Sequence, residues 1–132
     1  MVETPEAASA EILVVEDDPQ VRAMLRQILE VAGFTVREAV DGKDAMKRWQ
    51  EHPSDLVITD LLMPEMDGLE VISELRKLSP TTKIIAITGG GPTKRLNFLQ
   101  PAKLLGASRT LHKPFERAEL LHHVQDLLAQ PA

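Results

Sequence analysis

Short apolar runs alternate with longer amphipathic segments along the chain. The short runs are rich in β-branched residues and are bounded by turn-forming residues, a pattern that indicates β-strands. Such runs occur at residues 12–15, 35–40, 56–59, 84–88 and 109–112. Runs without apolar–polar alternation are typical of strands buried on both faces, as in a parallel sheet covered by helices.

The segments between the strands carry apolar residues at helical spacing. The longest stripe has positions i, i+4, i+7, i+8 and i+11, and consists of Val21, Leu25, Ile28, Leu29 and Ala32. Two further stripes consist of Leu69, Ile72 and Leu75, and of Leu120, Val124, Leu127 and Leu128. A weaker stripe, Ala45 and Trp49, follows the expected turn at Asp41-Gly42.

Proline and glycine mark the ends of these helical segments. Pro19 and Asp67-Gly68 stand where helices begin, and Gly33 and Gly106 stand just beyond helix ends. Repeated β-α units in one small chain predict the α/β class, with an open, doubly wound parallel sheet that has helices on both faces.

The segment after the fourth strand departs from this pattern. Gly89-Gly90-Gly91-Pro92 favours turns, and Pro101 does not fit deep inside a helix. We therefore expect a long loop and a short fourth helix that begins no earlier than about Phe98.

Composition narrows the choice of protein class. The 132 residues fit one domain, which we place at residues 11–130 behind a flexible N-terminal extension at 1–10. The net charge of −5 and the lack of a helix-turn-helix segment argue against direct DNA binding. The absence of cysteine excludes disulfides and thiolate chemistry. There is no apolar run of membrane-spanning length and no signal-peptide pattern, so we expect a cytoplasmic protein that does not associate with membranes.

Polar residues follow four of the predicted strands. Glu16, Asp17 and Asp18 come after the first strand, Asp60 ends the third, Thr88 ends the fourth and Lys113 follows the fifth. In an open parallel sheet, ligands bind at the carboxyl ends of the strands, near the point where the strand order reverses. Carboxylates gathered there repel one another, and Mg²⁺, which prefers oxygen ligands, relieves that repulsion. Together with a hydroxyl and an ammonium group, such a site matches a phosphoryl group.

The segments ILVVEDDP, VITDLLMP, AITGG and LHKPF, in this order, resemble the receiver domain of two-component response regulators. The resemblance covers the chain from about Glu11 to Gln130. It implies a flavodoxin-like fold with five strands in the order 2-1-3-4-5. It also implies that Asp60 is the phosphorylated aspartate, Thr88 the switch hydroxyl and Lys113 the lysine that pairs with the phosphoryl group.

The same resemblance implies a Mg²⁺ site. Its ligands would be Glu16, Asp17, Asp60 and the backbone carbonyl of Leu62, with Asp17 binding directly and Glu16 through water. Asp18, one position beyond the acidic pair, is expected to cap the following helix. The bond before Pro114 is expected to be cis.

The implied partners are a sensor histidine kinase or histidine phosphotransferase and an unidentified downstream protein. The domain would catalyse only its own phosphorylation and dephosphorylation and would signal through the face formed by residues 88–113. Without a separate output segment, we expect it to act by binding a partner or relaying phosphate. Formation of a homodimer on phosphorylation is a further alternative.

Three features depart from the family pattern. Thr110 occupies the position where the family usually has an aromatic ring, so we expect a different readout, in which phosphorylation orders the loop. The stretch from Thr88 to Lys113 is longer than usual. Leu62 and Gly90 cannot position a water molecule through their side chains, which predicts a long-lived phosphorylated state.

Other interpretations remain for each signal. The acidic residues before Pro19 could simply cap a helix. The altered loop and Thr110 would suit a pseudo-receiver that binds proteins without phosphorylation. A flavodoxin-like enzyme or flavin carrier shares the fold class, but the aromatic content of 3% offers few rings to hold a flavin.

Overall fold

The computed structural model describes residues 10–61, 68–88 and 106–130. The expected N-terminal extension lies outside these ranges except for Ala10, which is buried and accepts a hydrogen bond from the Thr35 amide. Leu62, Gly90 and the expected short helix after about Phe98 also lie outside them. Within the described ranges, no helix has the length and apolar character needed to cross a lipid bilayer.

Five parallel strands form one sheet in the order β2-β1-β3-β4-β5. They are β1 (Glu11–Val15), β2 (Thr35–Ala39), β3 (Leu56–Asp60), β4 (Lys83–Thr88) and β5 (Arg109–His112). The three central strands are buried almost throughout, which confirms the interpretation of the runs that lack alternation. Since β1 pairs with both β2 and β3, the strand order reverses at β1, and the carboxyl ends of β1 and β3 flank the expected ligand position.

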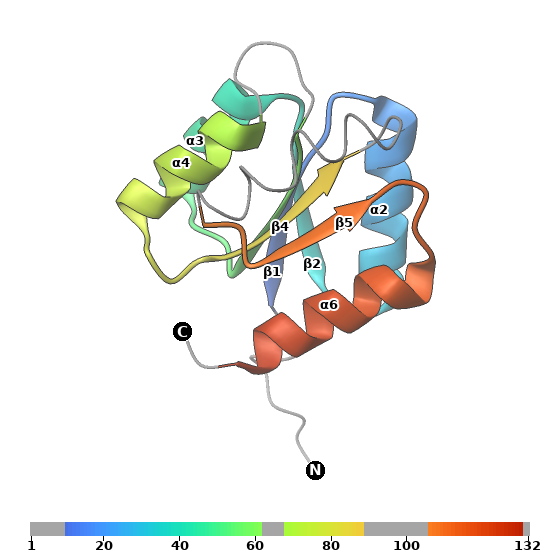
Figure 1. The fold of residues 1–132 in the computed structure, drawn as a ribbon. Coiled ribbons are helices and arrows are strands. Elements are labelled where there is room, and N and C mark those ends of the chain that lie inside the picture. The colour runs from blue at the N-terminus through green and yellow to red at the C-terminus, as the bar shows by residue number, and fades with distance from the viewer. Residues whose placement is uncertain (1–9, 62–67, 89–105, 131–132) are drawn as a thin grey trace.

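Helices cover both faces of the sheet, as predicted (Figure 1). Helices α2 (Pro19–Val31) and α6 (Arg117–Ala129) lie on one face, and α3 (Gly42–Glu51) and α4 (Gly68–Leu78) lie on the other. Alternate residues of each central strand supply two separate hydrophobic clusters. In β1, Ile12 and Val14 pack with α2 and α6, whereas Leu13 and Val15 pack with α3 and α4.

The predicted helical stripes are buried for the most part. In α2 the side chains of Leu25, Ile28 and Leu29 are buried, while Ala32 lies beyond the helix as its exposed C-cap. Gly33 follows with φ of 101°, a conformation that glycine adopts without strain, which confirms its place after the helix.

The residues of the turn predicted at Asp41-Gly42 form the start of a helix. Asp41 is the N-cap of α3, and its side chain accepts a hydrogen bond from the Asp44 amide at 2.8 Å. Gly42 is the first residue of the same helix. The β2–α3 connection is therefore short, because the capping residue follows the strand almost at once.

Candidate functional site

The acidic residues after β1 form a loop that is held at three points. The Glu16 amide donates to the Ala39 carbonyl at the end of β2, at 3.1 Å. The Asp18 amide donates to Glu16 Oε2, also at 3.1 Å. The side chain of Asp18 accepts from the Gln20 amide at 2.9 Å and so caps α2, which confirms the expected capping role.

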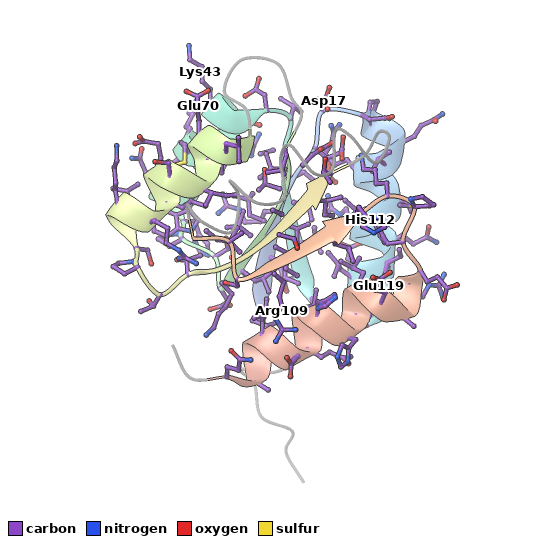
Figure 2. The ribbon with its side chains drawn as sticks, in the orientation of Figure 1. Asp17, Lys43, Glu70, Arg109, His112 and Glu119 are labelled. Atoms are coloured by element: carbon purple, nitrogen blue, oxygen red, sulfur yellow. The ribbon has the colours of Figure 1, made fainter. Side chains whose placement is uncertain are left out.

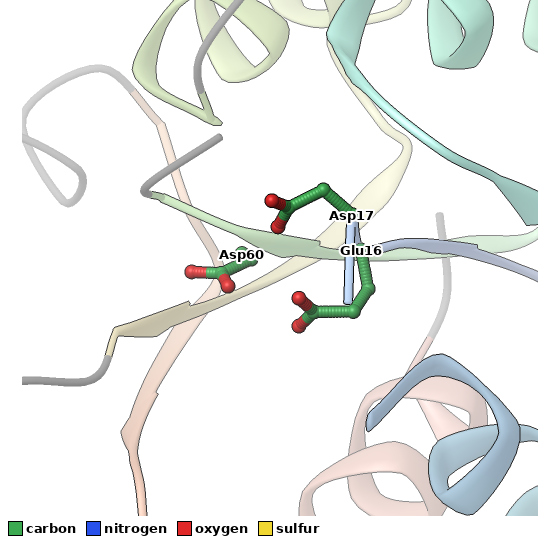
Figure 3. Close-up of side chains that lie close together, drawn as sticks. All are labelled: Glu16, Asp17 and Asp60. Atoms are coloured by element: carbon green, nitrogen blue, oxygen red, sulfur yellow. The ribbon is translucent and has the colours of Figure 1, made fainter. Parts of the chain in front are cut away.

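Glu16 and Asp17 meet Asp60 at the carboxyl edge of the sheet. One carboxylate oxygen from each residue lies within 4.8 Å of one from each of the other two. Figure 3 shows the three side chains, from the ends of β1 and β3, arranged around a common space. Glu16 and Asp60 are 2% and 6% exposed, whereas Asp17 is open to solvent. The chain thus brings together the three carboxylates that the sequence placed at separate strand ends.

Lys113 completes this group. Its Nζ lies 3.3 Å from Glu16 Oε1 and 3.2 Å from Asp60 Oδ2. Lys113 comes directly after β5, and its amide donates to the Thr88 carbonyl at 2.8 Å. The Lys113–Pro114 peptide bond is cis, as expected.

The charges in this group perturb one another. Burial, reinforced by the negative charge of Asp60, raises the pKa of Glu16 to about 7. Burial alone would lower the pKa of Lys113, but the carboxylates of Asp60 and Glu16 outweigh it and raise that pKa. Three carboxylates lie beside one ammonium group, so Lys113 alone does not offset all the negative charge that these side chains could carry.

This imbalance fits a divalent cation. The donors are all carboxylate oxygens, which are hard ligands of the kind that Mg²⁺ prefers. The exposed side of Asp17 also leaves room for the waters that Mg²⁺ retains. Among the described residues, Glu16, Asp17 and Asp60 are therefore the group with the composition and spacing of a magnesium site. Leu62, whose carbonyl was expected to join them, lies outside those residues.

Thr88 lies at the same edge, at the end of β4. Its neighbour Ile87 is the register partner of Asp60, and Thr88 itself is paired with His112 of β5. The Thr88 side chain is fully buried. Thr110 is half-buried and pairs with Ala86, farther from the carboxyl edge of the sheet.

Figure 2 places Asp17 and Arg109 at opposite ends of the sheet. Arg109, at the start of β5, forms an ion pair with Asp126 of α6. The Arg109–Asp126 ion pair is thus separate from the Glu16, Asp17 and Asp60 carboxylates, which lie at the carboxyl edge of the sheet.

Two contacts with the site were missed in the sequence. Gly68 was predicted as a helix start, but a Cβ atom there would also lie 2.3 Å from the Asp60 carbonyl oxygen. Arg22 donates from Nη1 to the Glu16 carbonyl oxygen at 2.8 Å. The sequence carries no spacing signal for this contact, because the acceptor is a backbone carbonyl outside α2.

Comparisons with known proteins agree with this geometry. The family model for the response regulator receiver domain matches residues 12–125. The response regulator receiver protein CpdR of Brucella abortus is 36% identical over 89% of this chain and 95% of its own length. The transcriptional regulatory protein SrrA of Staphylococcus aureus is 33% identical over 91% of this chain, which spans only 48% of that longer protein.

A solved structure shows the same fold with a ligand. The response regulator protein TrrA of Thermotoga maritima, in complex with Mg²⁺-BeF, has a TM-score of 0.79 and 34% identity, over 89% of this chain and 98% of that one. The match of the family model, the similarity to CpdR and the carboxylate group at the sheet edge lead to one conclusion. This chain belongs to the receiver domain family of two-component response regulators.

Proposed function

We propose that this receiver domain is a phosphoacceptor switch in which Asp60 receives a phosphoryl group from the phosphohistidine of a kinase or phosphotransferase. The observation that carries the proposal is the position of Lys113, whose ammonium contacts both Asp60 and Glu16 beside the exposed carboxylate of Asp17. Carboxylates that serve only to cap helices have no need of a shared cation.

The chemistry follows from the charges. A carboxylate oxygen of Asp60 attacks the phosphorus atom, the new O–P bond forms, and the bond from phosphorus to the histidine nitrogen breaks. The ammonium of Lys113 lies beside the Asp60 carboxylate and offers its positive charge to the incoming phosphoryl oxygens. Glu16, Asp17 and Asp60 would hold a Mg²⁺ ion, which supplies further positive charge to these oxygens. The Mg²⁺-BeF complex of TrrA supports this assignment by similarity.

The switch would operate through Thr88. Its position next to the register partner of Asp60 supports this role, because the phosphoryl group would form at the same edge of the sheet. A hydrogen bond from this hydroxyl to the phosphoryl group would favour a second packing of the β4–β5 end, and a downstream protein would recognise it. The lack of an aromatic side chain at Thr110 means that the response does not depend on a ring at that position.

Incubation with Mg²⁺ and acetyl phosphate, followed by intact mass measurement, tests the proposal. We expect the wild-type protein to gain one phosphoryl group and Asp60→Asn to gain none. Asp55→Asn is the matched control, because Asp55 lies next to the other end of β3 and binds the Glu11 amide. A wild-type protein that gains no phosphoryl group would contradict the proposal and favour a pseudo-receiver that binds proteins without phosphorylation.

A further inference from the structure

We propose that Arg22 of α2 is a positioning residue for the acidic pair, Glu16 and Asp17, and thereby sets the affinity of the site for Mg²⁺. The inference rests on the proposed magnesium site and extends it to a residue other than the three carboxylates, Glu16, Asp17 and Asp60. The contact of Arg22 with the site is a hydrogen bond to the backbone carbonyl of Glu16.

The guanidinium of Arg22 joins three elements of the fold. Its Nη1 donates to the Glu16 carbonyl oxygen at 2.8 Å, and its Nε donates to Glu38 Oε1 of β2 at 2.9 Å. The Arg22 side chain is only 16% exposed, so these hydrogen bonds compete little with water. Arg22 therefore links α2 and β2 to the loop that follows β1.

The contact with Glu16 determines where Asp17 lies. The Glu16 carbonyl belongs to the peptide group that connects Glu16 to Asp17, so a hydrogen bond to this oxygen fixes the plane from which the Asp17 side chain extends. The amide on the other side of Glu16 is held by the Ala39 carbonyl at 3.1 Å. Both peptide groups of Glu16 are therefore held, which restricts the directions from which the Glu16 and Asp17 side chains extend.

Arg22 acts through this geometry because its charge is already balanced. Hydrogen bonds from Arg26 and, against the effect of burial, from Arg22 lower the pKa of Glu38, so Glu38 stays ionised and offsets the guanidinium charge. The pKa of Glu16 responds to burial, Asp60, Asp18 and Lys113, and Arg22 is not among its causes. Partners of this kind, which orient metal ligands without binding the metal, commonly change metal affinity by about 10- to 100-fold.

The side chain has to be arginine for this role. The rigid fork of the guanidinium directs one N–H to Glu38 and another to the Glu16 carbonyl. The single ammonium of lysine cannot reproduce both contacts with the same geometry. Arg22→Lys should therefore keep the charge and lose the positioning.

Arg26 provides a matched control. It also binds Glu38, from Nη1 to Oε2 at 2.6 Å, but its ion pairs within the described residues are with Glu38 and Glu30 and not with Glu16. Its side chain is 43% exposed and forms a second ion pair with Glu30. Substituting Arg26 thus disturbs the same ion-pair network and leaves the Glu16 carbonyl bonded to Arg22.

The experiment is a Mg²⁺ titration of the metal-free protein, followed by amide chemical shifts of the loop after β1. We expect Arg22→Lys and Arg22→Gln to weaken Mg²⁺ binding about tenfold, and Arg26→Lys and Arg26→Gln to change it by less than about twofold. At saturating Mg²⁺, phosphorylation of the Arg22 variants by acetyl phosphate should return to the wild-type rate. Thermal unfolding, followed by the fluorescence of the single tryptophan, Trp49, verifies that each variant is folded.

The outcomes separate the two proposals. If the wild-type protein binds no Mg²⁺, the proposed function and this inference both fail. If it binds Mg²⁺ and the folded Arg22 variants bind equally well, or if Arg26 variants lose as much affinity, this inference alone is overturned. Should Arg22→Gln not fold, Arg22→Lys decides by the same comparison.

Discussion

The ammonium nitrogen of Lys113 lies 3.2 Å from Asp60 Oδ2, although the two residues are 53 positions apart in the sequence. The same nitrogen lies 3.3 Å from Glu16 Oε1. A single cation thus bridges the ends of β1 and β3 from its place after β5. In the metal-free protein this contact partly neutralises the two buried carboxylates. Removal of the cation should therefore lower the free energy of unfolding.

Lys113→Met should destabilise the metal-free protein. At pH 8 the loss of the cation leaves two buried carboxylates without their shared partner, and we expect the free energy of unfolding to fall by about 2 kcal/mol. The value is below that for a fully buried pair because the Lys113 side chain is 28% exposed. Urea unfolding followed by Trp49 fluorescence measures it. Lys77→Met is the control, since Lys77 is 70% exposed in its ion pair with Glu74 and its removal should change stability by less than about 0.5 kcal/mol.

Mg²⁺ should bind more weakly in acid. With the pKa of Glu16 at about 7, most Glu16 carboxyl groups carry a proton at pH 6 that Mg²⁺ has to displace, and few carry one at pH 8. We expect the dissociation constant to be about tenfold higher at pH 6, with proton release on binding near pH 7. Calorimetry in buffers of different ionisation enthalpy reports both quantities. In Glu16→Gln the dependence on pH should largely disappear; its persistence would assign the proton to another group.

The same shift predicts the stability of the metal-free protein. The folded-state pKa of Glu16 is raised from 4.5 to about 7, so the folded state binds the proton more tightly than the unfolded chain. The contribution of Glu16 to stability is therefore fully present below about pH 4.5 and is lost as the pH rises to about 7. Comparing the pH dependence of unfolding between wild type and Glu16→Gln isolates this contribution, and added Mg²⁺ should restore stability at pH 8. Equal pH profiles for the two proteins would contradict the prediction.

Asp17 and Asp18 should behave differently although they are adjacent. Asp18→Ala removes the N-cap of α2 and should cost about 1 kcal/mol of stability with little change in Mg²⁺ affinity. Asp17→Asn removes an exposed carboxylate from the metal group and should abolish Mg²⁺ binding with little effect on stability. Thermal unfolding and Mg²⁺ titration of both variants test the contrast, and Asp18→Ser should regain most of the lost stability. Loss of Mg²⁺ binding in Asp18→Ala would show that the capping assignment is incomplete.

Gly68→Ala should damage both the fold and the site. The new Cβ would lie 2.3 Å from the Asp60 carbonyl oxygen and 2.6 Å from Leu61 Cα, and backbone atoms of a buried strand end cannot move aside easily. We expect a loss of about 3 kcal/mol and slower phosphorylation of Asp60. Gly33→Ala is the comparison: with no atom within 4 Å of the new Cβ, it is strained only by its φ of +101°. It should cost about 1 kcal/mol and leave phosphorylation unchanged. Equal effects of the two substitutions on phosphorylation would refute the close-contact argument.

The strands could be predicted because their apolar runs are continuous. The run at 109–112 has the same bounds as β5, and the other predicted strands differ from the structure by one residue at one end. The predicted helical stripes identified the buried residues of the helices less completely. Val71 of α4 is fully buried but is absent from the stripe of Leu69, Ile72 and Leu75, since a stripe read at a spacing of three follows one line along a helix, whereas packing buries a wider face.

The cluster of three carboxylates, Glu16, Asp17 and Asp60, was predictable for a topological reason. Parallel strands end at the same edge, so residues that follow different strands meet there whatever their separation in the sequence. The contacts that hold these carboxylates in place were not predictable in this way. The contact of Arg22 with the Glu16 carbonyl depends on how α2 is rotated against the sheet and on the register of Glu38 opposite Val14, and neither can be read from composition or spacing.

The peptide hydrogen bond between Lys113 and Thr88 has a consequence for how the domain would respond to an added negative charge. The Lys113 amide is bonded to the Thr88 carbonyl at 2.8 Å, so the residue that carries the cation and the residue that carries the hydroxyl share one backbone linkage. If a phosphoryl group forms on Asp60, attraction at the ammonium and hydrogen bonding at the hydroxyl would act on strand ends that are already bonded to each other, and we expect the two ends to shift together.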